Sequence, residues 1–355
     1  MRRRLLVTGA GSGASNNLVR SLRSGDPSLH IVGCNDDRFE LKKSTADQRF
    51  LVPRASEPGY IDALRRVINS EHIHLVIPTG DADVRALSDA RRRLNGKVFL
   101  PRKPVIDLCQ DKYELTRFLR ARGLPAPETY AVRGIQSIDR IFARFGTRRP
   151  LWCRARTGSR SLGAAPVLRP AQARAWMEQW AELRGVPVGA FTLSEYLPGR
   201  DFLCQSVWSH GRMTLCATFE RLSYFGGENS PSGVSSLSSL AKTVVDERLV
   251  DICRRVVAAV APGTSGAFSI DLKEDPSETP CVTEINAGRF FIGMTAFDAV
   301  FKHNMPLVYV RLALGEPLEI REEYNTAEEH YLVRDLDTLP GVFHSSEFFE
   351  GIETA

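Results

Sequence analysis

GAFSIDLKEDPSETPCVTEINAGRFF, residues 266–291, is the stretch of the chain that decides its fold. Two extended segments, AFSIDLK and CVTEIN, are joined there by the turn-rich EDPSETP. If the hairpin folds symmetrically about that turn, Asp271 lies opposite Glu284, and the two-residue repeat of a strand places Asn286 on the same face. Like charges across a ladder repel each other, whereas Mg²⁺ accepts a few carboxylate and amide oxygens together with phosphate oxygens. The stretch therefore predicts a magnesium site; two solvated acidic positions on an edge hairpin are the alternative.

A second stretch, LWCRARTGSRSLGAAPVL (151–168), carries two arginines and a glycine-containing loop. Strand alternation places Arg154 and Arg156 on one face. The loop would offer backbone N–H groups to phosphate oxygens at Gly158, Ser159, Ser161 and Gly163. Two guanidinium groups beside such a loop predict an anion site, although the G-x-x-x-x-G-K-[ST] pattern of a P-loop is absent. An exposed hairpin with solvated arginines is equally compatible with this stretch alone.

A third stretch, TLSEYLPGRDFLCQSVWS (192–209), predicts two strands joined by a proline–glycine turn. Such a segment can line a nucleotide slot, because Glu195 and the backbone of Tyr196 and Leu197 offer hydrogen bonds to an adenine edge. The turn would then bring Asp201 toward a ribose. A hairpin without any ligand is the other interpretation.

The first hundred residues alternate between apolar and amphipathic segments. Strands are predicted at 5–7, 30–34, 74–78 and 97–101, and helices at 15–24, 59–70 and 81–94. This alternation predicts a parallel sheet with crossover helices. The pattern changes at PRKP (101–104), after which a helix over 111–122 leads into an α+β region with helices at 171–183 and 246–260.

The opening loop, VTGAGSGASNN, satisfies G-x-G-x-x-A through Gly9, Gly11 and Ala14. Asp36 and Asp37 follow a second strand, at roughly the distance at which a ribose carboxylate stands in a dinucleotide site. A nicotinamide site is one interpretation. The other is that the glycines only allow a tight turn and close helix packing.

Composition narrows the range of partners. The net charge of +5 is spread along the 355 residues, which disfavours nucleic acid and is compatible with small anionic ligands. Seven cysteines without any C-x-x-C suggest neither a disulfide framework nor a zinc site, so we expect a reducing cytoplasm. No stretch approaches the length needed to cross a bilayer, so no membrane partner is expected.

Taken in order, DK (111–112), the R-x-R glycine loop, SEYLPGRD, FSIDLKED and TEINAGR resemble an ATP-grasp enzyme. The chain is similar in particular to short, single-copy proteins related to the carbamoyl-phosphate synthetase large subunit, and the resemblance covers residues 4–320. It implies an α/β plus α+β protein, in which a Rossmann-like pre-ATP-grasp domain precedes a two-lobed ATP-grasp domain. The expected divisions are 1–104 for the first domain, 105–188 and 189–320 for the two lobes, and 321–355 for a C-terminal extension.

The motifs and the resemblance together predict the site residues. The predicted ATP-binding residues are Lys112, Arg154, Arg156, Gly158, Ser161, Glu195, Tyr196, Leu197 and Asp201. The predicted magnesium ligands are Asp271, Glu284 and Asn286, and the predicted catalytic residues are Arg154 and Arg289. Two positions depart from the family pattern: Ala155 stands where relatives commonly have proline, and Arg289 stands one place after the arginine of E-x-N-x-R.

The resemblance implies that a substrate carboxylate attacks the γ-phosphorus of ATP and that an amine or similar nucleophile opens the resulting acyl phosphate. ATP and Mg²⁺ are the implied cofactors, small-molecule carboxylates and amines are the implied partners, and a homo-oligomer is compatible with the sequence. YFGGENSPSGVSSLSSL (224–240) is interpreted as a substrate-facing loop or a mobile connection. The alternatives are a nicotinamide-dependent oxidoreductase built on the opening loop and a non-catalytic ATP-binding protein, which the displaced Arg289 makes plausible.

Overall fold

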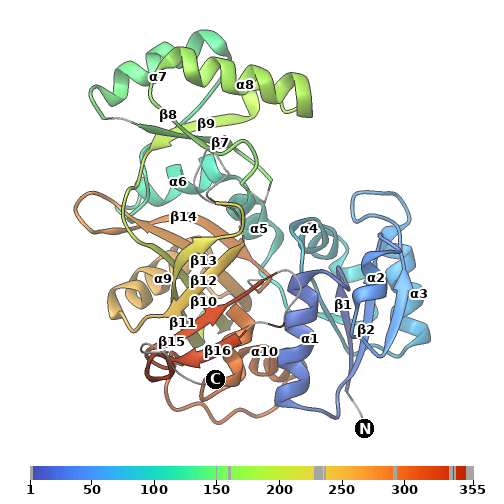
Figure 1. Cartoon of the computed structure of the whole chain (residues 1–355). Coiled ribbons are helices and arrows are strands. Elements are labelled where there is room, and N and C mark those ends of the chain that lie inside the picture. Colours follow the sequence, from blue (N-terminus) through green and yellow to red (C-terminus); the bar gives the residue numbers. More distant parts are fainter. Residues whose placement is uncertain are drawn as a thin grey trace.

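The computed structural model of the chain describes residues 3–148, 150–158, 161–227, 235, 237–290, 294–335, 339 and 341–348. The described strands form one parallel sheet and two antiparallel sheets. The parallel sheet and the larger antiparallel sheet occupy the lower part of Figure 1, and the small antiparallel sheet stands above them. In the described part of the chain, no helix combines the length and the apolar composition that crossing a bilayer requires.

The first sheet is parallel, as predicted, with the strand order β3-β2-β1-β4-β5. Its strands are β1 (Arg4–Thr8), β2 (His30–Asn35), β3 (Gln48–Leu51), β4 (Leu75–Ile77) and β5 (Lys97–Val98). Its helices are α1 (Gly13–Gly25), α2 (Glu40–Lys43), α3 (Tyr60–Ser70) and α4 (Asp81–Asp89), followed by the 3₁₀ turn η1 (Arg91–Arg93). The apolar stripe of α1 packs on one face of the sheet and that of α3 packs on the other. The short, largely exposed β3 and the single-turn α2 were not predicted, because neither carries an apolar pattern.

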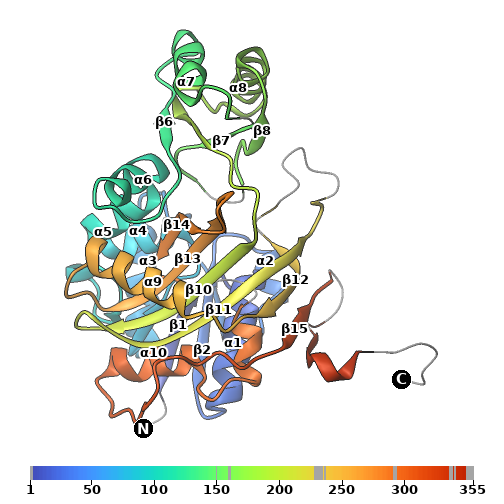
Figure 2. The ribbon, with the colours of Figure 1, turned by 90° about the vertical axis from the view of Figure 1, so that its left-hand side faces the viewer.

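The small sheet is antiparallel, with the order β6-β9-β7-β8. Its strands are β6 (Thr129–Ala131), β7 (Leu151–Ala155), β8 (Ala165–Val167) and β9 (Phe191–Glu195). Its helices are α7 (Ile138–Phe145) and α8 (Pro170–Arg184), with the 3₁₀ turns η2 (Ile135–Ser137) and η3 (Val188–Ala190). Both helices pack on the same side of this sheet and share a core with it (Figure 2). That core contains no residue from the other two sheets.

The large sheet has the order β14-β13-β10-β11-β12-β15-β16. Its strands are β10 (Asp201–Ser209), β11 (Arg212–Tyr224), β12 (Ser238–Thr243), β13 (Gly266–Glu274), β14 (Pro280–Ala287), β15 (His330–Val333) and β16 (Gly341–His344). One face is covered by α5 (Lys103–Gln110), α6 (Lys112–Arg120) and α9 (Glu247–Val260). The other face packs on η4 (Met294–Ala299) and α10 (Met305–Leu314), and a last 3₁₀ turn, η5 (Ser345–Glu347), follows β16.

Helix α10 belongs to the cores of two sheets at once. Its buried side chains share a cluster with β1 and β4 of the parallel sheet and with β10 and β11 of the large sheet. A helix enclosed in this way is apolar around most of its circumference, which explains why MPLVYVRLAL shows no amphipathic period and was not predicted. The parallel and large sheets are therefore joined through α10.

The sheets divide the chain differently from the predicted lobes. β9 falls in the predicted second lobe (189–320) but pairs with β6 and β7, so the small sheet extends to Glu195. Most of α5 and all of α6 fall in the predicted first lobe (105–188), but both helices pack on the large sheet. β15 and β16, in the predicted extension 321–355, continue the large sheet beyond β12. The four domains themselves stay a prediction.

Candidate active site

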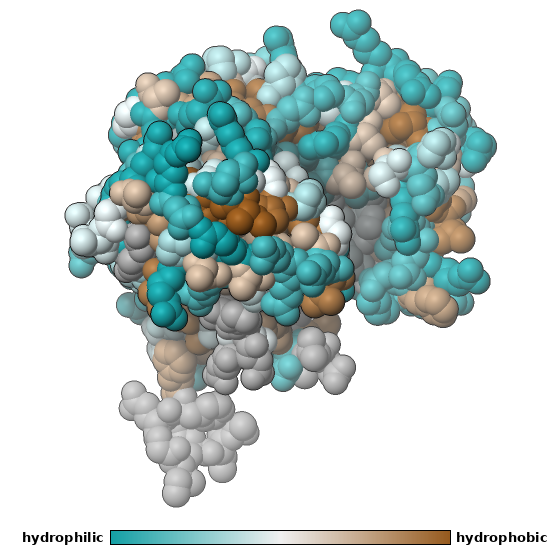
Figure 3. Space-filling view, turned by 90° about the horizontal axis from the view of Figure 1, so that it is seen from above, coloured by the Kyte–Doolittle hydropathy of each residue, from teal (hydrophilic) through white to brown (hydrophobic). Residues whose placement is uncertain are grey.

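A cleft of about 1220 Å³ lies where the three sheets meet. The loops after β1, β2 and β4 line it from the parallel sheet, which accords with ligand binding at the carboxyl ends of parallel strands. The glycine loop after β7 lines it from the small sheet, and β13 and β14 line it from the large sheet. Seen from above, a recess separates the small-sheet region from the parallel-sheet region (Figure 3). All the predicted site residues line this cleft except Arg156.

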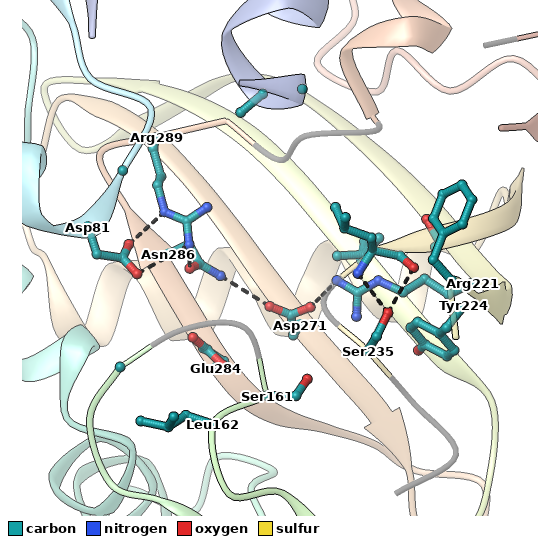
Figure 4. A pocket seen from close by; sticks show the side chains of 18 of the residues that line it. Asp81, Ser161, Leu162, Arg221, Tyr224, Ser235, Asp271, Glu284, Asn286 and Arg289 are labelled. Atoms are coloured by element: carbon teal, nitrogen blue, oxygen red, sulfur yellow. Dashed lines mark hydrogen bonds and ion pairs between the residues drawn. The ribbon is translucent and has the colours of Figure 1, made fainter. Parts of the chain in front are cut away.

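The β13–β14 hairpin has the predicted register. Asp271 pairs with Glu284, and a bulge follows, so that Leu272 pairs with Val282. The Asn286 Nδ2 atom donates a hydrogen bond of 3.1 Å to Asp271 Oδ2. Two carboxylates and an amide from neighbouring strands therefore gather at the cleft floor (Figure 4).

Asp271 is held in an environment that disfavours its charge. Burial, together with the charges of Glu284 and Asp201, raises the pKa of Asp271 to about 6, although the charge of Arg221 acts in the opposite direction. Arg221, on β11, forms an ion pair with Asp271 and another, at 3.1 Å, with Asp201. The Asp201 carboxylate also accepts a hydrogen bond from the Tyr224 hydroxyl. Arg221 thus links the predicted ribose end of the cleft to the predicted metal end.

Two cations stand beside Glu284. Lys112 begins α6, and its Nζ atom lies 3.4 Å from Glu284 Oε1 and donates to the Gly158 carbonyl at 2.7 Å. Arg154, on β7, donates from Nη2 to the Thr283 carbonyl at 2.8 Å. Its Nε atom is buried without a hydrogen-bond partner among the described residues. Burial lowers the pKa of the Arg154 guanidinium, although the nearby carboxylates act in the opposite direction. An unpaired buried donor is costly, so the Arg154 environment suits an additional anion.

Arg156 does not join Arg154 in the cleft, contrary to the prediction. Strand alternation ends with β7 at Ala155, and the Arg156 side chain turns to the start of α6. Its Nε atom donates to both carboxylate oxygens of Asp111 at 2.8 Å, and its Nη2 atom donates to Glu114 at 3.3 Å. The reason is that Asp111 caps α6 and Glu114 stands in the first turn, so two carboxylates already attract the guanidinium.

The glycine loop after β7 reaches the cleft through Gly158 and Ser161, both at positive φ (+101° and +53°). Gly163, at φ +63°, packs so closely on Phe191 that a Cβ atom would lie 2.5 Å from its ring. Ser159 lies outside the described residues, as does most of 228–236 within the predicted substrate-facing segment.

The predicted adenine segment lies where the chain passes from the small sheet to the large one. Glu195, Tyr196 and Leu197 line the cleft after β9. The Glu195 N–H donates to the Glu128 carbonyl at 2.9 Å, which fixes the end of the strand. Asp201 opens β10 immediately afterwards. Three consecutive residues therefore line one edge of the cleft.

Arg289 lines the cleft although it stands one residue after the arginine position of the E-x-N-x-R pattern. In an unbroken strand, residue 289 would face away from Asn286, because strand side chains alternate. β14 ends at Ala287, and Gly288 turns the chain at φ +94°. The Arg289 guanidinium then donates to Asn286 Oδ1 and, from Nε at 2.6 Å, to Oδ1 of Asp81 at the start of α4 (Figure 4). Gly288 thus compensates for the one-residue shift.

The opening loop is shaped by packing. A Cβ atom on Gly9 would lie 2.6 Å from Thr79 Oγ1, and one on Gly11 would lie 1.7 Å from the Glu40 carbonyl oxygen. In a dinucleotide site, the second glycine leaves room for the pyrophosphate, whereas here the backbone of α2 fills that space. Asp37 accepts hydrogen bonds from the N–H groups of residues 39 and 40. The loop therefore favours the interpretation that its glycines serve close packing.

Arg221 and Asp81 line the cleft but were not predicted. For Arg221 a signal existed: it ends the strand segment TLCATFER, most of whose other side chains are buried, and a charge beside such a run indicates a paired site. Asp81 carried no such signal, because its contact with Arg289 joins residues 208 positions apart.

Residues 5–98 match the family model described as PylC-like, N-terminal domain. Among solved structures, an L-amino acid ligase from Bacillus licheniformis is similar, with a TM-score of 0.70 and 13% identity over 93% of this chain and 79% of that one. The carboxyaminoimidazole ribonucleotide synthase of Aspergillus clavatus complexed with ATP has a TM-score of 0.67 and 16% identity, over 94% and 81% of the two chains. The biotin carboxylase domain of Hydrogenobacter thermophilus 2-oxoglutarate carboxylase, in complex with MgADP and bicarbonate, has a TM-score of 0.71 and 13% identity, over 94% and 74%.

The TM-scores establish the fold. Because the sequence identities are low, the function has to be argued from the site. Three observations indicate the same fold: the order of the sheets, the cleft between them and the matching structures. The chain has the ATP-grasp fold, in which a Rossmann-like pre-ATP-grasp domain precedes two α+β lobes.

Proposed function

We propose that the protein is an ATP-dependent ligase that activates a substrate carboxylate as an acyl phosphate, which an amine then attacks with loss of phosphate. One observation carries this proposal: two carboxylates, an amide and two cations converge on one cleft. They are Asp271, Glu284, Asn286, Lys112 and Arg154. Phosphoryl transfer requires positioning and charge neutralisation more than a protein nucleophile, and this set of side chains offers both.

Asp271, Glu284 and Asn286 would hold Mg²⁺. The donor set fits, because Mg²⁺ is commonly bound by one or two carboxylates with phosphate oxygens completing its shell. Within the described ranges no three His, Cys, Asp or Glu side chains gather to hold a metal by themselves, so the amide and a bound phosphate would be needed. When bound, the ion would neutralise charge on the phosphates.

Lys112 and Arg154 would bind the ATP phosphates beside the hairpin, since both already contact β14. The unpaired Nε atom of Arg154 supports this role, since an anion would satisfy it. The loop containing Gly158 and Ser161 would cover the phosphates and limit the access of water. Lys112 now contacts both Glu284 and the Gly158 carbonyl, so it would move little to reach a phosphate beside them.

Arg289 would stabilise the negative charge that develops on the carboxylate and the transferred phosphoryl group. It lies beside Asn286, at the predicted metal end of the cleft, and its side chain is only 12% exposed. The adenine would be bound by Glu195, Tyr196 and Leu197. Asp201 would contact the ribose after its own contacts with Arg221 and Tyr224 are released. No step requires a nucleophilic side chain.

The matching structures support this proposal. They are an L-amino acid ligase, a synthase complexed with ATP and a biotin carboxylase domain with MgADP and bicarbonate. From the order of its motifs, we also propose that the chain is related to single-copy proteins similar to the carbamoyl-phosphate synthetase large subunit. Carboxylates and amines are accordingly the proposed substrates.

The test is a screen for ADP release with Mg²⁺, ATP and pooled carboxylates, with and without amines. Glu284→Gln should abolish the activity without changing the melting temperature by more than a few degrees, because it removes a ligand from the cleft. Glu278→Gln, on the exposed turn of the same hairpin, is the matched control. ATP binding without ADP release from any pool would favour a non-catalytic ATP-binding protein, and absence of ATP binding would refute both.

A further inference from the structure

Arg334 is a cleft-lining cation that forms no ion pair with a carboxylate among the residues that the structure describes. It follows β15 directly, and its backbone N–H donates to the Ser239 carbonyl at 2.9 Å, so the strand pairing fixes its position. Its side chain lines the cleft. The guanidinium carbon lies 5.6 Å from the centroid of the Phe225 ring. No Asp or Glu of the described residues forms an ion pair with it, and burial alone lowers the pKa of Arg334.

The other buried cations of the cleft differ in this respect. Lys112, Arg221 and Arg289 each contact a carboxylate. Arg154 lies in the field of Glu284 and Asp271, at the end of the cleft where the proposed ATP phosphates bind. Desolvating a guanidinium without compensation is unfavourable, so the Arg334 position, like that of Arg154, suits an anion.

The location separates this anion from the reacting group. In the large sheet, β10, β11 and β12 lie between β13, which carries Asp271, and β15. Four strand spacings of about 4.8 Å separate the two strands, so one small group cannot contact both Asp271 and Arg334. The proposed phosphate contacts lie on β7, α6 and the β13–β14 hairpin, and this hairpin forms the opposite edge of the large sheet from β15 and β16. An anion at Arg334 is therefore a different group from the one that is phosphorylated.

We propose that Arg334 determines substrate specificity by binding an anionic group, a carboxylate or a phosphate, that a substrate carries in addition to its reacting group. This inference rests on the proposed ligase function and adds a substrate class to it. A planar guanidinium matches either anion with two parallel hydrogen bonds. The Phe225 ring under the guanidinium would keep its plane in one orientation.

The experiment measures binding to the full chain in the presence of Mg²⁺ and ADP, so that no turnover occurs. The probes are glutarate, glutamate and phosphoglycerate, each compared by calorimetry with butyrate, which lacks the second anionic group. We expect at least one of them to bind wild type about tenfold or more tightly than butyrate, since a charge-assisted pair is worth that much. Glutarate or glutamate as the preferred probe would identify a carboxylate, and phosphoglycerate would identify a phosphate.

Arg334→Gln should abolish that preference while leaving the affinity for ATP within about twofold. Arg334→Lys should retain part of it, because the charge remains but the planar fork is lost. Arg255→Gln, on the exposed face of α9, is the matched control. A preference that survives in Arg334→Gln, or wild type without any preference, would overturn the inference even if ADP release is observed. Loss of ATP binding in wild type would instead refute the proposed function.

Discussion

Arg289 donates its Nε hydrogen to Asp81 across a distance of 2.6 Å, although one residue follows β14 of the large sheet and the other begins α4 of the parallel-sheet domain. The Arg289 side chain is 12% exposed and that of Asp81 is 31% exposed. The same guanidinium contacts Asn286. The first domain therefore helps to hold an arginine in the proposed reaction centre.

Asp81→Asn should lower the rate of ADP release by about tenfold to a hundredfold with little change in ATP affinity, because Arg289 loses its charged partner and its fixed orientation. The measurements are kcat and the Kd for ATP, each determined separately in mutant and wild type. Asp89→Asn, at the other end of α4, removes a more exposed carboxylate and should change neither. An equal loss of ATP binding in Asp81→Asn would contradict this assignment.

Gly288→Ala should destabilise the fold by about 2–4 kcal/mol, since an L side chain is strained at positive φ and crowding adds to the cost. A Cβ atom there would lie 3.0 Å from Leu100 and 3.1 Å from Val84. The control is Gly185→Ala: that glycine also has a positive φ (+65°), but no atom lies within 4 Å of the added carbon. Urea denaturation of both variants separates crowding from backbone strain, and equal losses would show that packing at 288 is unimportant.

Arg154→Gln should raise the apparent KM for ATP by about tenfold to a hundredfold, the effect of losing a charge-assisted contact to phosphate. Arg156→Gln is the natural comparison, because it removes the same charge two residues away. Its partly exposed ion pairs with Asp111 and Glu114 should cost about 1 kcal/mol of stability or less and leave ATP kinetics unchanged. If steady-state kinetics showed a raised KM for ATP in Arg156→Gln and not in Arg154→Gln, Arg156 would be the residue that binds phosphate.

Asp298 should make stability depend on pH. Burial raises the pKa of Asp298 to about 7, against the hydrogen bonds that it accepts from Ser21 and from the Met305 N–H. A carboxyl whose pKa is raised on folding contributes most stability below its unfolded pKa, and the contribution is lost as the pH rises through the folded value. The free energy of unfolding should therefore fall between about pH 4 and pH 7, with a slope of up to about 1.4 kcal/mol per pH unit from this group.

The pH dependence can be tested by urea denaturation across that range. Asp298→Asn should flatten the curve, whereas Asp251→Asn, an exposed carboxyl on α9, should leave its slope unchanged. If the Asp298→Asn curve keeps the wild-type slope, other groups carry the dependence.

Local patterns predicted the hairpin well and long-range contacts poorly. The register of Asp271 and Glu284 follows from strand period and turn position, both readable from a short segment. The same period failed for Arg156, because the strand ended one residue earlier and distant carboxylates competed for the side chain. Arg334 and Asp81 were missed because their significance depends on a cleft that only the assembled sheets create.

Some elements were missed for other reasons. α7 has a clear apolar stripe of Ile138, Ile141, Phe142 and Phe145, so periodicity could have found it. The enclosed α10 gave no such signal. The β9 strand was predicted as a strand, but its sheet could not be read from sequence, since neighbouring segments on both sides also form strands.

The position of α10 has a consequence for how a nucleotide would enter. Because one helix is buried against both the parallel and the large sheets, separating them would expose a shared apolar core, which is expensive. The small sheet has a core of its own and is tied to the rest through the segments 121–128 and 196–200. We therefore expect the entry of ATP to be governed by rotation of the small sheet and its helices relative to the parallel and large sheets, which stay fixed to each other.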